Sequence, residues 1–225
     1  MSLPPIVVFD LDGTLAETAP DIMHTLNVIL QQEGLAALPV ERARELVGAG
    51  ARALIERGFK ASGRPLDAQT LERLFEQFLE IYAGAVAPNS YLHDGVVEAL
   101  DALTADGFVF GVCTNKPILH TRLILDAFGV TNRFAAIAGR DSYAFFKPDP
   151  RHLTMTIAEA GADPRRAVMI GDSRTDVATA KAAGIPVVCV PFGYTDVPVE
   201  DLSPDRVIQH FSALPEAVRA LVPAA

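Results

Sequence analysis

Two aspartates that directly follow a short apolar run are the residues of this chain best suited to chemistry. The sequence PIVVFDLDGTL places Asp10 and Asp12 after residues 6–9, which read as a buried strand. Side chains alternate along a strand, so both carboxylates should point to one side while Leu11 points to the other. Two carboxylates close together repel each other in a dry site, unless a cation separates them or one holds a proton. A hard divalent cation such as Mg2+ prefers oxygen ligands and meets this need.

A plain structural role for this pair is the alternative. Asp-Gly is a frequent hairpin signal, so Asp12 and Gly13 could form an ordinary polar turn. The residues after Gly13 read TLAETAPDIMHTL and lack the alternation of a returning strand. A hairpin would also leave the acid at position 10 unexplained, so we favour the chemical interpretation.

Further polar clusters follow apolar runs later in the chain. They are Thr114, Asn115 and Lys116 after FVFGVC, Lys147 in FFKPDP, and Asp172, Ser173 and Asp176 after AVMI. Taken singly, each has an ordinary explanation as a helix cap or a solvated lysine. In doubly wound sheets, however, ligands bind beyond the carboxyl ends of the strands. One shared site explains all the clusters together better than a separate structural reason for each.

The residue types in these clusters suit a phosphoryl group. A hydroxyl and backbone N–H groups at a helix start bind anions, and a lysine neutralises charge on phosphoryl oxygens. Asp172 can complete a metal site with Asp10, and Asp176, one helical turn further on, can reach the same place. An aspartate can attack phosphorus, and a second carboxyl group can act as acid and then as base. The residues alone do not say which aspartate attacks.

The elements that must position these clusters alternate between strands and helices. DGVVEALDALTADG reads as a helix and FVFGVCT as a strand, and the alternation continues to a late RVIQ strand and a final SALPEAVRALV helix. Such alternation predicts an α/β fold with a parallel sheet wrapped by helical crossovers. Nearly continuous apolar strands indicate that both faces of the sheet are covered.

A helical segment interrupts this pattern near the N-terminus. PDIMHTLNVILQQEG and DAQTLERLFEQFLEIYAG both carry apolar residues at helical spacing, and no convincing strand lies between them. APNSY reads as the linker that leads back to the sheet. We therefore predict a core domain of residues 1–15 and 89–225, with an all-helical domain of residues 16–88 inserted into it.

Composition narrows the classes of partner. The chain has 225 residues and a net charge of -9, which argues against nucleic acid or an anionic membrane surface as a partner. Cys113 and Cys189 lie inside apolar runs and are expected to pack in the core of a protein kept in a reducing cytosol. Since no targeting segment or membrane-length apolar run is recognisable, we expect a cytoplasmic protein, either a monomer or a homodimer.

The motifs DLDGTLAET, VCTNKP, KPDP and GDSRTDVATAKAAG, in this order, resemble the four motifs of the haloacid dehalogenase superfamily. The resemblance implies a Rossmann-like, doubly wound parallel sheet with an inserted all-helical cap domain. It also implies that Asp10 attacks phosphorus, while Asp12 protonates the leaving group and then activates water. Thr114 and the backbone of Asn115 would bind the phosphoryl group, and Lys147 would stabilise it.

The same resemblance implies a magnesium site. Mg2+ would be held by Asp10, by the main-chain carbonyl of Asp12 and by Asp172. Asp176 would support these ligands without binding the ion itself. Two departures from the usual pattern, AET after the first motif and LHDGV where Pro before Gly is usual, leave these residues intact.

Further segments bear on the substrate, which is expected to be a small phosphorylated metabolite. TAPDI, ELVGAGARALIERGF and PFGYTD resemble family members that hydrolyse 2-phosphoglycolate, although phosphatases of sugar or amino-sugar phosphates share them. Within the cap, Gly48, Gly50 and Arg52 are candidates to face the site. An inward Arg52 would suit a carboxylated substrate, although a place on a solvated helix face is the simpler interpretation of this arginine.

Other activities stay open, each with a feature that counts against it. A phosphoglucomutase-like phosphotransferase usually lacks the acid at position 176, and a dehalogenase needs none at position 12. A scaffold that only binds phosphorylated ligands should have lost Asp10, Asp12 or Lys147, and all three are present.

Overall fold

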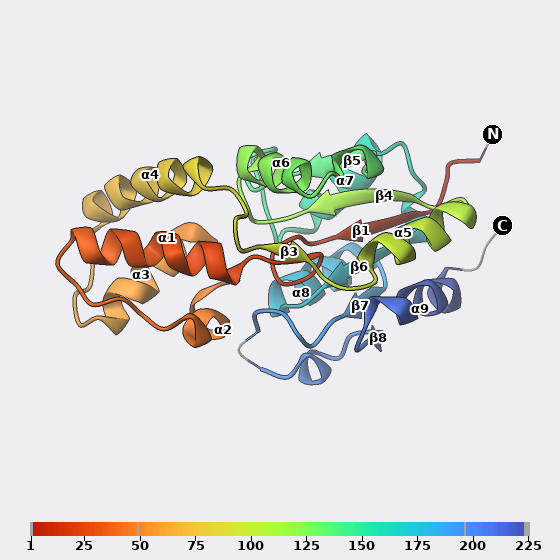
Figure 1. The fold of residues 1–225 in the computed structure, drawn as a ribbon. Helices are drawn as coiled ribbons and strands as arrows, with labels where there is room; N and C mark the ends of the chain where they lie inside the picture. Colours follow the sequence, from red (N-terminus) through yellow and green to blue (C-terminus); the bar gives the residue numbers. More distant parts are fainter. Residues whose placement is uncertain (1, 49, 196, 223–225) are drawn as a thin grey trace.

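A six-stranded parallel sheet organises the part of the chain that this computed structural model describes, residues 2–48, 50–195 and 197–222 (Figure 1). The strand order is β5-β4-β1-β6-β7-β8. The chain steps from β1 to β4 and β5 on one side, then returns to β6 on the other, so the order reverses beside β1. The strands are β1 (Ile6–Phe9), β4 (Val109–Cys113), β5 (Ala136–Ala138), β6 (Ala167–Gly171), β7 (Val187–Cys189) and β8 (Arg206–Val207).

Helices cover both faces of this sheet, as the apolar strands predicted. Val7 and Phe9 of β1 pack in a core with α5, α6 and α9, whereas Ile6 and Val8 pack in a second core with α7 and α8. The alternation along one strand therefore supplies both faces. These helices are α5 (Val96–Ala105), α6 (Ile118–Ala127), α7 (Pro150–Glu159), α8 (Arg174–Ala183) and α9 (Leu214–Leu221). The predicted α/β class with a doubly wound parallel sheet is confirmed.

A group of helices lies beyond the carboxyl ends of the strands (Figure 1). Its members are α1 (Ala19–Gln32), α2 (Ala43–Leu46), α3 (Ala51–Ala61) and α4 (Ala68–Gly84). They pack on one another through buried apolar side chains such as Leu26, Leu54 and Phe78. Asp67 caps α4 by accepting a hydrogen bond from the backbone N–H of Thr70 at 2.8 Å. The described residues between 20 and 85 contain no strand, in agreement with their helical spacing.

Two short chain crossings join these helices to the sheet. Strands β2 (Ala16–Glu17) and β3 (Tyr91–Leu92) pair antiparallel, so the entry and the exit lie side by side. Asp21 at the start of α1 accepts hydrogen bonds from the backbone N–H of Asn89 and, at 2.5 Å, from the hydroxyl of Ser90. We propose the division into a core of residues 1–15 and 89–225 and a cap of residues 16–88 around these crossings.

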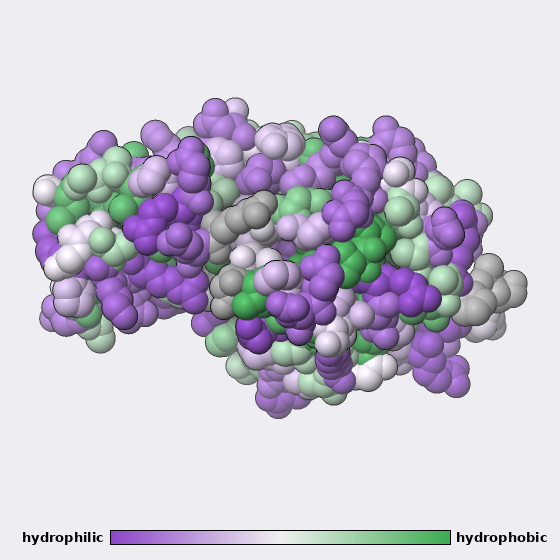
Figure 2. All heavy atoms as spheres, turned by 90° about the horizontal axis from the view of Figure 1, so that it is seen from below, coloured by the Kyte–Doolittle hydropathy of each residue, from purple (hydrophilic) through white to green (hydrophobic). Residues whose placement is uncertain are grey.

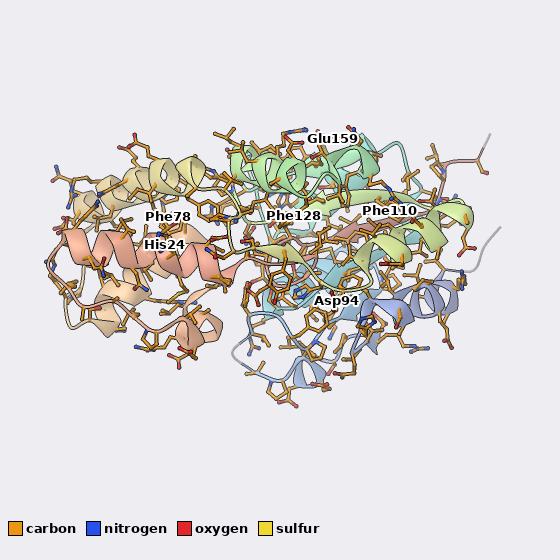
Figure 3. All side chains as sticks on the ribbon, in the orientation of Figure 1. His24, Phe78, Asp94, Phe110, Phe128 and Glu159 are labelled. Atoms are coloured by element: carbon orange, nitrogen blue, oxygen red, sulfur yellow. The ribbon has the colours of Figure 1, made fainter. Side chains whose placement is uncertain are left out.

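The remaining predictions from the sequence concern the packing of single residues, the location of the protein and its partners. Both cysteines are free and buried, and His24 is exposed on α1 (Figure 3). Figure 2 shows hydrophilic residues spread over much of the face seen from below. In the described part of the chain, none of the helices has the length and apolarity needed for a membrane crossing. The cytoplasmic location, the oligomeric state and the lack of nucleic-acid partners stay predictions.

Candidate active site

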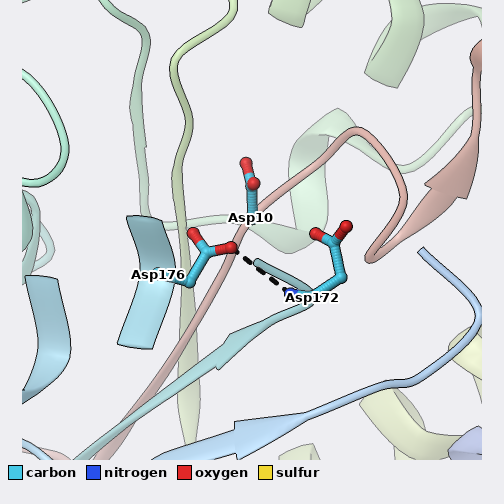
Figure 4. A group of neighbouring side chains, drawn as sticks. All are labelled: Asp10, Asp172 and Asp176. Atoms are coloured by element: carbon cyan, nitrogen blue, oxygen red, sulfur yellow. Dashed lines mark hydrogen bonds between the residues drawn. The ribbon is translucent and has the colours of Figure 1, made fainter. Parts of the chain in front are cut away.

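Three carboxylates and one lysine meet at the carboxyl end of β1. Asp10, Asp172 and Asp176 each offer an oxygen, and these oxygens lie within 4.8 Å of one another (Figure 4). The ammonium nitrogen of Lys147 lies 3.0 Å from the carboxylate of Asp10 and 2.5 Å from that of Asp176. These residues come from three separate strand ends or loops, so the sheet brings together the clusters that the sequence singled out.

The charges in this group are strongly coupled because the site is buried. Burial raises the pKa of Asp10 to about 6, although the charge of Lys147 acts against this shift. Burial, followed by the charges of Asp176 and Asp10, raises the pKa of Asp172 well above its usual value. For Lys147, burial lowers the pKa, but Asp10 and Asp176 outweigh that effect and the pKa is raised overall. Lys147 thus pairs with Asp10 and Asp176, and with Asp172 also close to these acids the group favours a further cation.

A side-chain hydroxyl and a backbone N–H hold Asp172 in place. The hydroxyl of Thr14 donates to one of its oxygens at 2.8 Å, and the backbone N–H of Tyr194 donates to the other at 2.6 Å. Gly193 makes this approach possible, since a Cβ atom there would lie 2.2 Å from the carboxylate. Asp172 therefore has a fixed orientation, as a ligand needs.

Asp176 sits on the first turn of α8 and is held from two sides. One of its oxygens pairs with Lys147, and the other accepts from the hydroxyl of Ser173 at 2.6 Å and from its backbone N–H at 3.1 Å. Because both oxygens are already engaged, Asp176 is better placed to fix Lys147 and α8 than to serve as a free ligand.

The carboxylate of Asp12 makes different contacts from those of Asp10. It accepts a hydrogen bond from the hydroxyl of Thr18 at 2.7 Å and pairs with the ammonium of Lys116 at 3.0 Å. Lys116 also donates to the hydroxyl of Tyr82, on α4, at 3.0 Å. The chain Asp12, Lys116 and Tyr82 therefore links the end of β1 to the helices beyond the sheet.

A pocket with a free volume of about 60 Å³ separates the sheet from these helices. Its walls on the sheet side include Asp10, Asp12, Thr114, Asn115 and Asp172. Thr114 is buried at the end of β4, and the side-chain amide of Asn115 donates to the carbonyl of Lys147 at 3.0 Å. Its walls on the helical side include Gly48, Gly50, Leu54, Phe78 and Tyr82.

The two predicted cap glycines reach the pocket, but the predicted arginine does not. Gly48 and Gly50 have φ angles of 106° and 89°, which favour glycine. The guanidinium of Arg52 instead forms two hydrogen bonds with Glu72, at 2.7 and 2.8 Å, and stacks on Phe75. Its ion pair with Glu72 on α4 keeps the Arg52 side chain out of the main pocket, and Arg52 lines a smaller neighbouring pocket instead.

Sequence reasoning missed several residues that shape the pocket. Tyr82 was recognised only as part of an apolar helix face, and Tyr194 only as part of PFGYTD. The Tyr194 hydroxyl accepts from the backbone N–H of Thr18 at 2.9 Å and so fixes the entry crossing. His120 lines the pocket with its Nε2 bound to the carbonyl of Leu79, and its buried Nδ1 has no hydrogen-bond partner within the described residues. His120 could have been suspected from the sequence, because it follows Lys116 by four residues, about one helical turn.

Comparison with known proteins places this arrangement in a family. Residues 7–190 match the family model described as haloacid dehalogenase-like hydrolase. The chain is 49% identical to a phosphoglycolate phosphatase from Mesorhizobium japonicum, over 93% of this chain and 92% of that protein. It is 46% identical to a phosphoglycolate phosphatase from Caulobacter vibrioides, over 96% and 91% respectively. The chain belongs to the haloacid dehalogenase-like hydrolase family.

Solved structures give the same result for the fold. The crystal structure of a predicted phosphoglycolate phosphatase from Haemophilus somnus matches with a TM-score of 0.88 at 30% identity, covering 96% of this chain and 99% of that one. The predicted family and the predicted class of enzyme, a phosphatase of this family, agree with these findings. The roles given to single residues stay predictions.

Proposed function

We propose that this chain is a Mg2+-dependent phosphomonoester hydrolase that acts on 2-phosphoglycolate through an aspartyl-phosphate on Asp10. The observation that carries the proposal is the group of Asp10, Asp172 and Asp176 at the edge of the pocket, with Lys147 paired to Asp10 and Asp176. The substrate is supported by the relatives named phosphoglycolate phosphatase.

The donor atoms present fit a magnesium ion. Carboxylate oxygens are its preferred ligands, and a cation besides Lys147 would stabilise the three close acids in their charged form. Asp10, Asp172 and the main-chain carbonyl of Asp12 would hold the ion, with Asp176 fixing Lys147 beside it. The bound ion would neutralise charge on the phosphoryl oxygens.

The protein side chains supply the remaining steps. Thr114 and Lys147 bind the phosphoryl oxygens, and a carboxylate oxygen of Asp10 attacks phosphorus. As the bond from phosphorus to the ester oxygen breaks, Asp12 gives its proton to that oxygen and glycolate leaves. Asp12 then takes a proton from water, whose oxygen attacks the aspartyl-phosphate. The bond from phosphorus to Asp10 breaks, and inorganic phosphate is released.

A panel of phosphate esters tests the proposal. Release of inorganic phosphate is measured with 2-phosphoglycolate, glucose 1-phosphate, glucose 6-phosphate and an amino-sugar phosphate, each with Mg2+ and with excess EDTA. We expect the highest kcat/KM for 2-phosphoglycolate and loss of turnover in EDTA, restored by Mg2+. A preference for a sugar ester, or full activity in EDTA, would contradict the proposal.

A further inference from the structure

Lys116 is a buried cation that the proposed mechanism leaves without a task. It lies in the loop between β4 and α6, is 8% exposed, and lines the same pocket as Asp10 and Thr114. Among the described residues that line this pocket, it is the one lysine or arginine. Arg52, the other candidate for an anion, is already paired with Glu72 outside this pocket.

The anionic partner of Lys116 is Asp12, the acid and base of the proposed mechanism. Its ammonium pairs with Asp12 at 3.0 Å and donates to the neutral hydroxyl of Tyr82 at 3.0 Å. If Asp12 turns to the ester oxygen, as the proposed mechanism requires, Lys116 keeps the neutral hydroxyl of Tyr82 but loses the carboxylate. A buried cation that has lost its counter-ion is strongly unfavourable. An anionic group on the substrate can take the place that Asp12 leaves.

The surroundings of Lys116 favour an anion of this kind. The ammonium of Lys116 is buried at the pocket wall, where the carboxylate of Asp12 balances its charge at 3.0 Å. Leu54 and Phe78 supply an apolar wall to the pocket, and an ion pair in such surroundings is screened little by water. The first turn of α3 opens on the same pocket with no acidic residue and no side-chain cap at Gly50, which adds positive potential.

We propose that Lys116 determines specificity by binding the carboxylate of a small phosphate monoester, replacing Asp12 as the counter-ion of the lysine. Tyr82 is a positioning residue that holds the ammonium at the boundary between sheet and helices. This inference rests on the proposed function. It names the residue that recognises the carboxylate of the substrate, a task that the proposed mechanism gives to no residue.

A matched pair of substrates isolates this contact. 2-Hydroxyethyl phosphate has the carbon chain of 2-phosphoglycolate with a neutral hydroxyl group in place of the carboxylate. In Lys116→Met, we expect kcat/KM for 2-phosphoglycolate to fall at least about 10-fold more than kcat/KM for 2-hydroxyethyl phosphate, the range of a charged hydrogen bond. Lys116→Arg keeps the charge and should keep part of the selectivity. Lys60→Met, the same change at an exposed lysine of α3, should leave the ratio as in the wild type.

Binding without turnover gives an independent readout. Calorimetry with 3-phosphonopropionate, a non-hydrolysable carbon analogue of 2-phosphoglycolate, is compared with propylphosphonate, which lacks the carboxylate. Lys116→Met should weaken 3-phosphonopropionate at least about 10-fold while changing propylphosphonate little. Circular dichroism shows whether each variant is folded, and Lys116→Arg provides the comparison if Lys116→Met is not.

The possible outcomes separate this inference from the proposed function. Equal losses on both esters, or equal losses for both phosphonates, would show that Lys116 acts only through Asp12 and would overturn the inference alone. A wild-type enzyme that does not prefer the carboxylated ester over the hydroxyethyl ester would overturn it as well. A wild-type enzyme that hydrolyses neither ester, yet releases phosphate from a sugar phosphate, would instead overturn the proposed function.

Discussion

The two walls of the pocket differ in how they use charge. On the sheet side, Lys147 pairs with Asp10 at 3.0 Å and with Asp176 at 2.5 Å, and Asp172 lies close to both acids. On the helical side, the wall includes Leu54 and Phe78, which carry no charge. A phosphoryl group is common to every phosphate ester, so the charged wall can serve many substrates. Selection among esters has to come from the helical wall and from the residues that bridge the two.

The two buried lysines of the site, Lys147 and Lys116, also differ in this way. Lys147 is 2% exposed between Asp10 and the fully buried Asp176. Lys116 is paired with Asp12, whose side chain is 19% exposed, and reaches across to Tyr82. The first lysine is fixed within the sheet side, whereas the second lies where sheet and helices meet. Substitutions on the two sides should therefore have different consequences.

The largest expected effect lies on the sheet side. Asp10→Asn removes the proposed nucleophile, and loss of a group that forms the covalent intermediate should lower kcat at least about 1,000-fold. Metal-dependent release of phosphate from 2-phosphoglycolate measures it, with circular dichroism to show that the variant is folded. Asp101→Asn, the same change at an exposed aspartate of α5, should keep wild-type activity. Turnover near wild type in Asp10→Asn would refute the nucleophile assignment.

Next in size is the effect of Lys147 on stability. Lys147→Met leaves the buried acids without their cation, which should lower the free energy of unfolding of the metal-free protein by about 3–5 kcal/mol. Lys116→Met should cost less, because Asp12 is more exposed and keeps its hydrogen bond from Thr18. Urea unfolding in EDTA compares the two. Equal losses would mean that the two lysines are equally essential to the fold.

The raised pKa of Asp10 gives the sheet side a dependence on pH. Since burial raises this pKa from 3.8 to about 6, folded Asp10 holds its proton between these values while the unfolded chain has lost it. The Asp10 contribution to stability is therefore present at low pH and is lost as the pH rises towards 6. Asp10→Asn lacks this contribution. From pH 4 to pH 7 the free energy of unfolding of the metal-free variant, relative to the wild type, should therefore rise by about 3 kcal/mol.

The difference between variant and wild type is the quantity to measure, across pH 4–7 in EDTA. Burial lowers the pKa of His152 to about 4, so this histidine makes stability rise over the same range and would hide the effect in either protein alone. His152 is present in both proteins and cancels in the difference. A difference that stays constant with pH would contradict the raised pKa of Asp10.

The sequence predicted the sheet side of the pocket better than the contacts between the sheet and the helices. Strand alternation and strand ends placed Asp10, Thr114 and Asp172 at one edge of the sheet, because backbone geometry alone decides which edge they share. The partner of Asp12 was not predictable in this way, since Lys116 lies 104 residues away and its approach depends on side-chain packing. Tyr82 was predicted to be buried on a helix face and is, but the contact of its hydroxyl depends on how α4 meets the sheet.

The smallest expected effect is at Arg52, and it tests the helical wall directly. Its place in the cap and the affinity of an arginine for a carboxylate made Arg52 a candidate, yet its guanidinium is bound by Glu72, 20 residues further along the chain. Both side chains of this pair are about half exposed, and such pairs contribute roughly 0.2–1 kcal/mol. Arg52→Ala should therefore lower stability by no more than about 1 kcal/mol and change KM less than about threefold, a difference below 0.7 kcal/mol.

The comparison of substrates decides between the two cations. KM is measured in Arg52→Ala and in Lys116→Met for 2-phosphoglycolate and for 4-nitrophenyl phosphate, which has no carboxylate. We expect the selective rise for 2-phosphoglycolate only in Lys116→Met, because Lys116 lines the pocket and Arg52 does not. A selective rise of about 10-fold in Arg52→Ala would mean that the guanidinium leaves Glu72 when substrate binds. The helical wall would then supply the charge that this structure places at its boundary with the sheet.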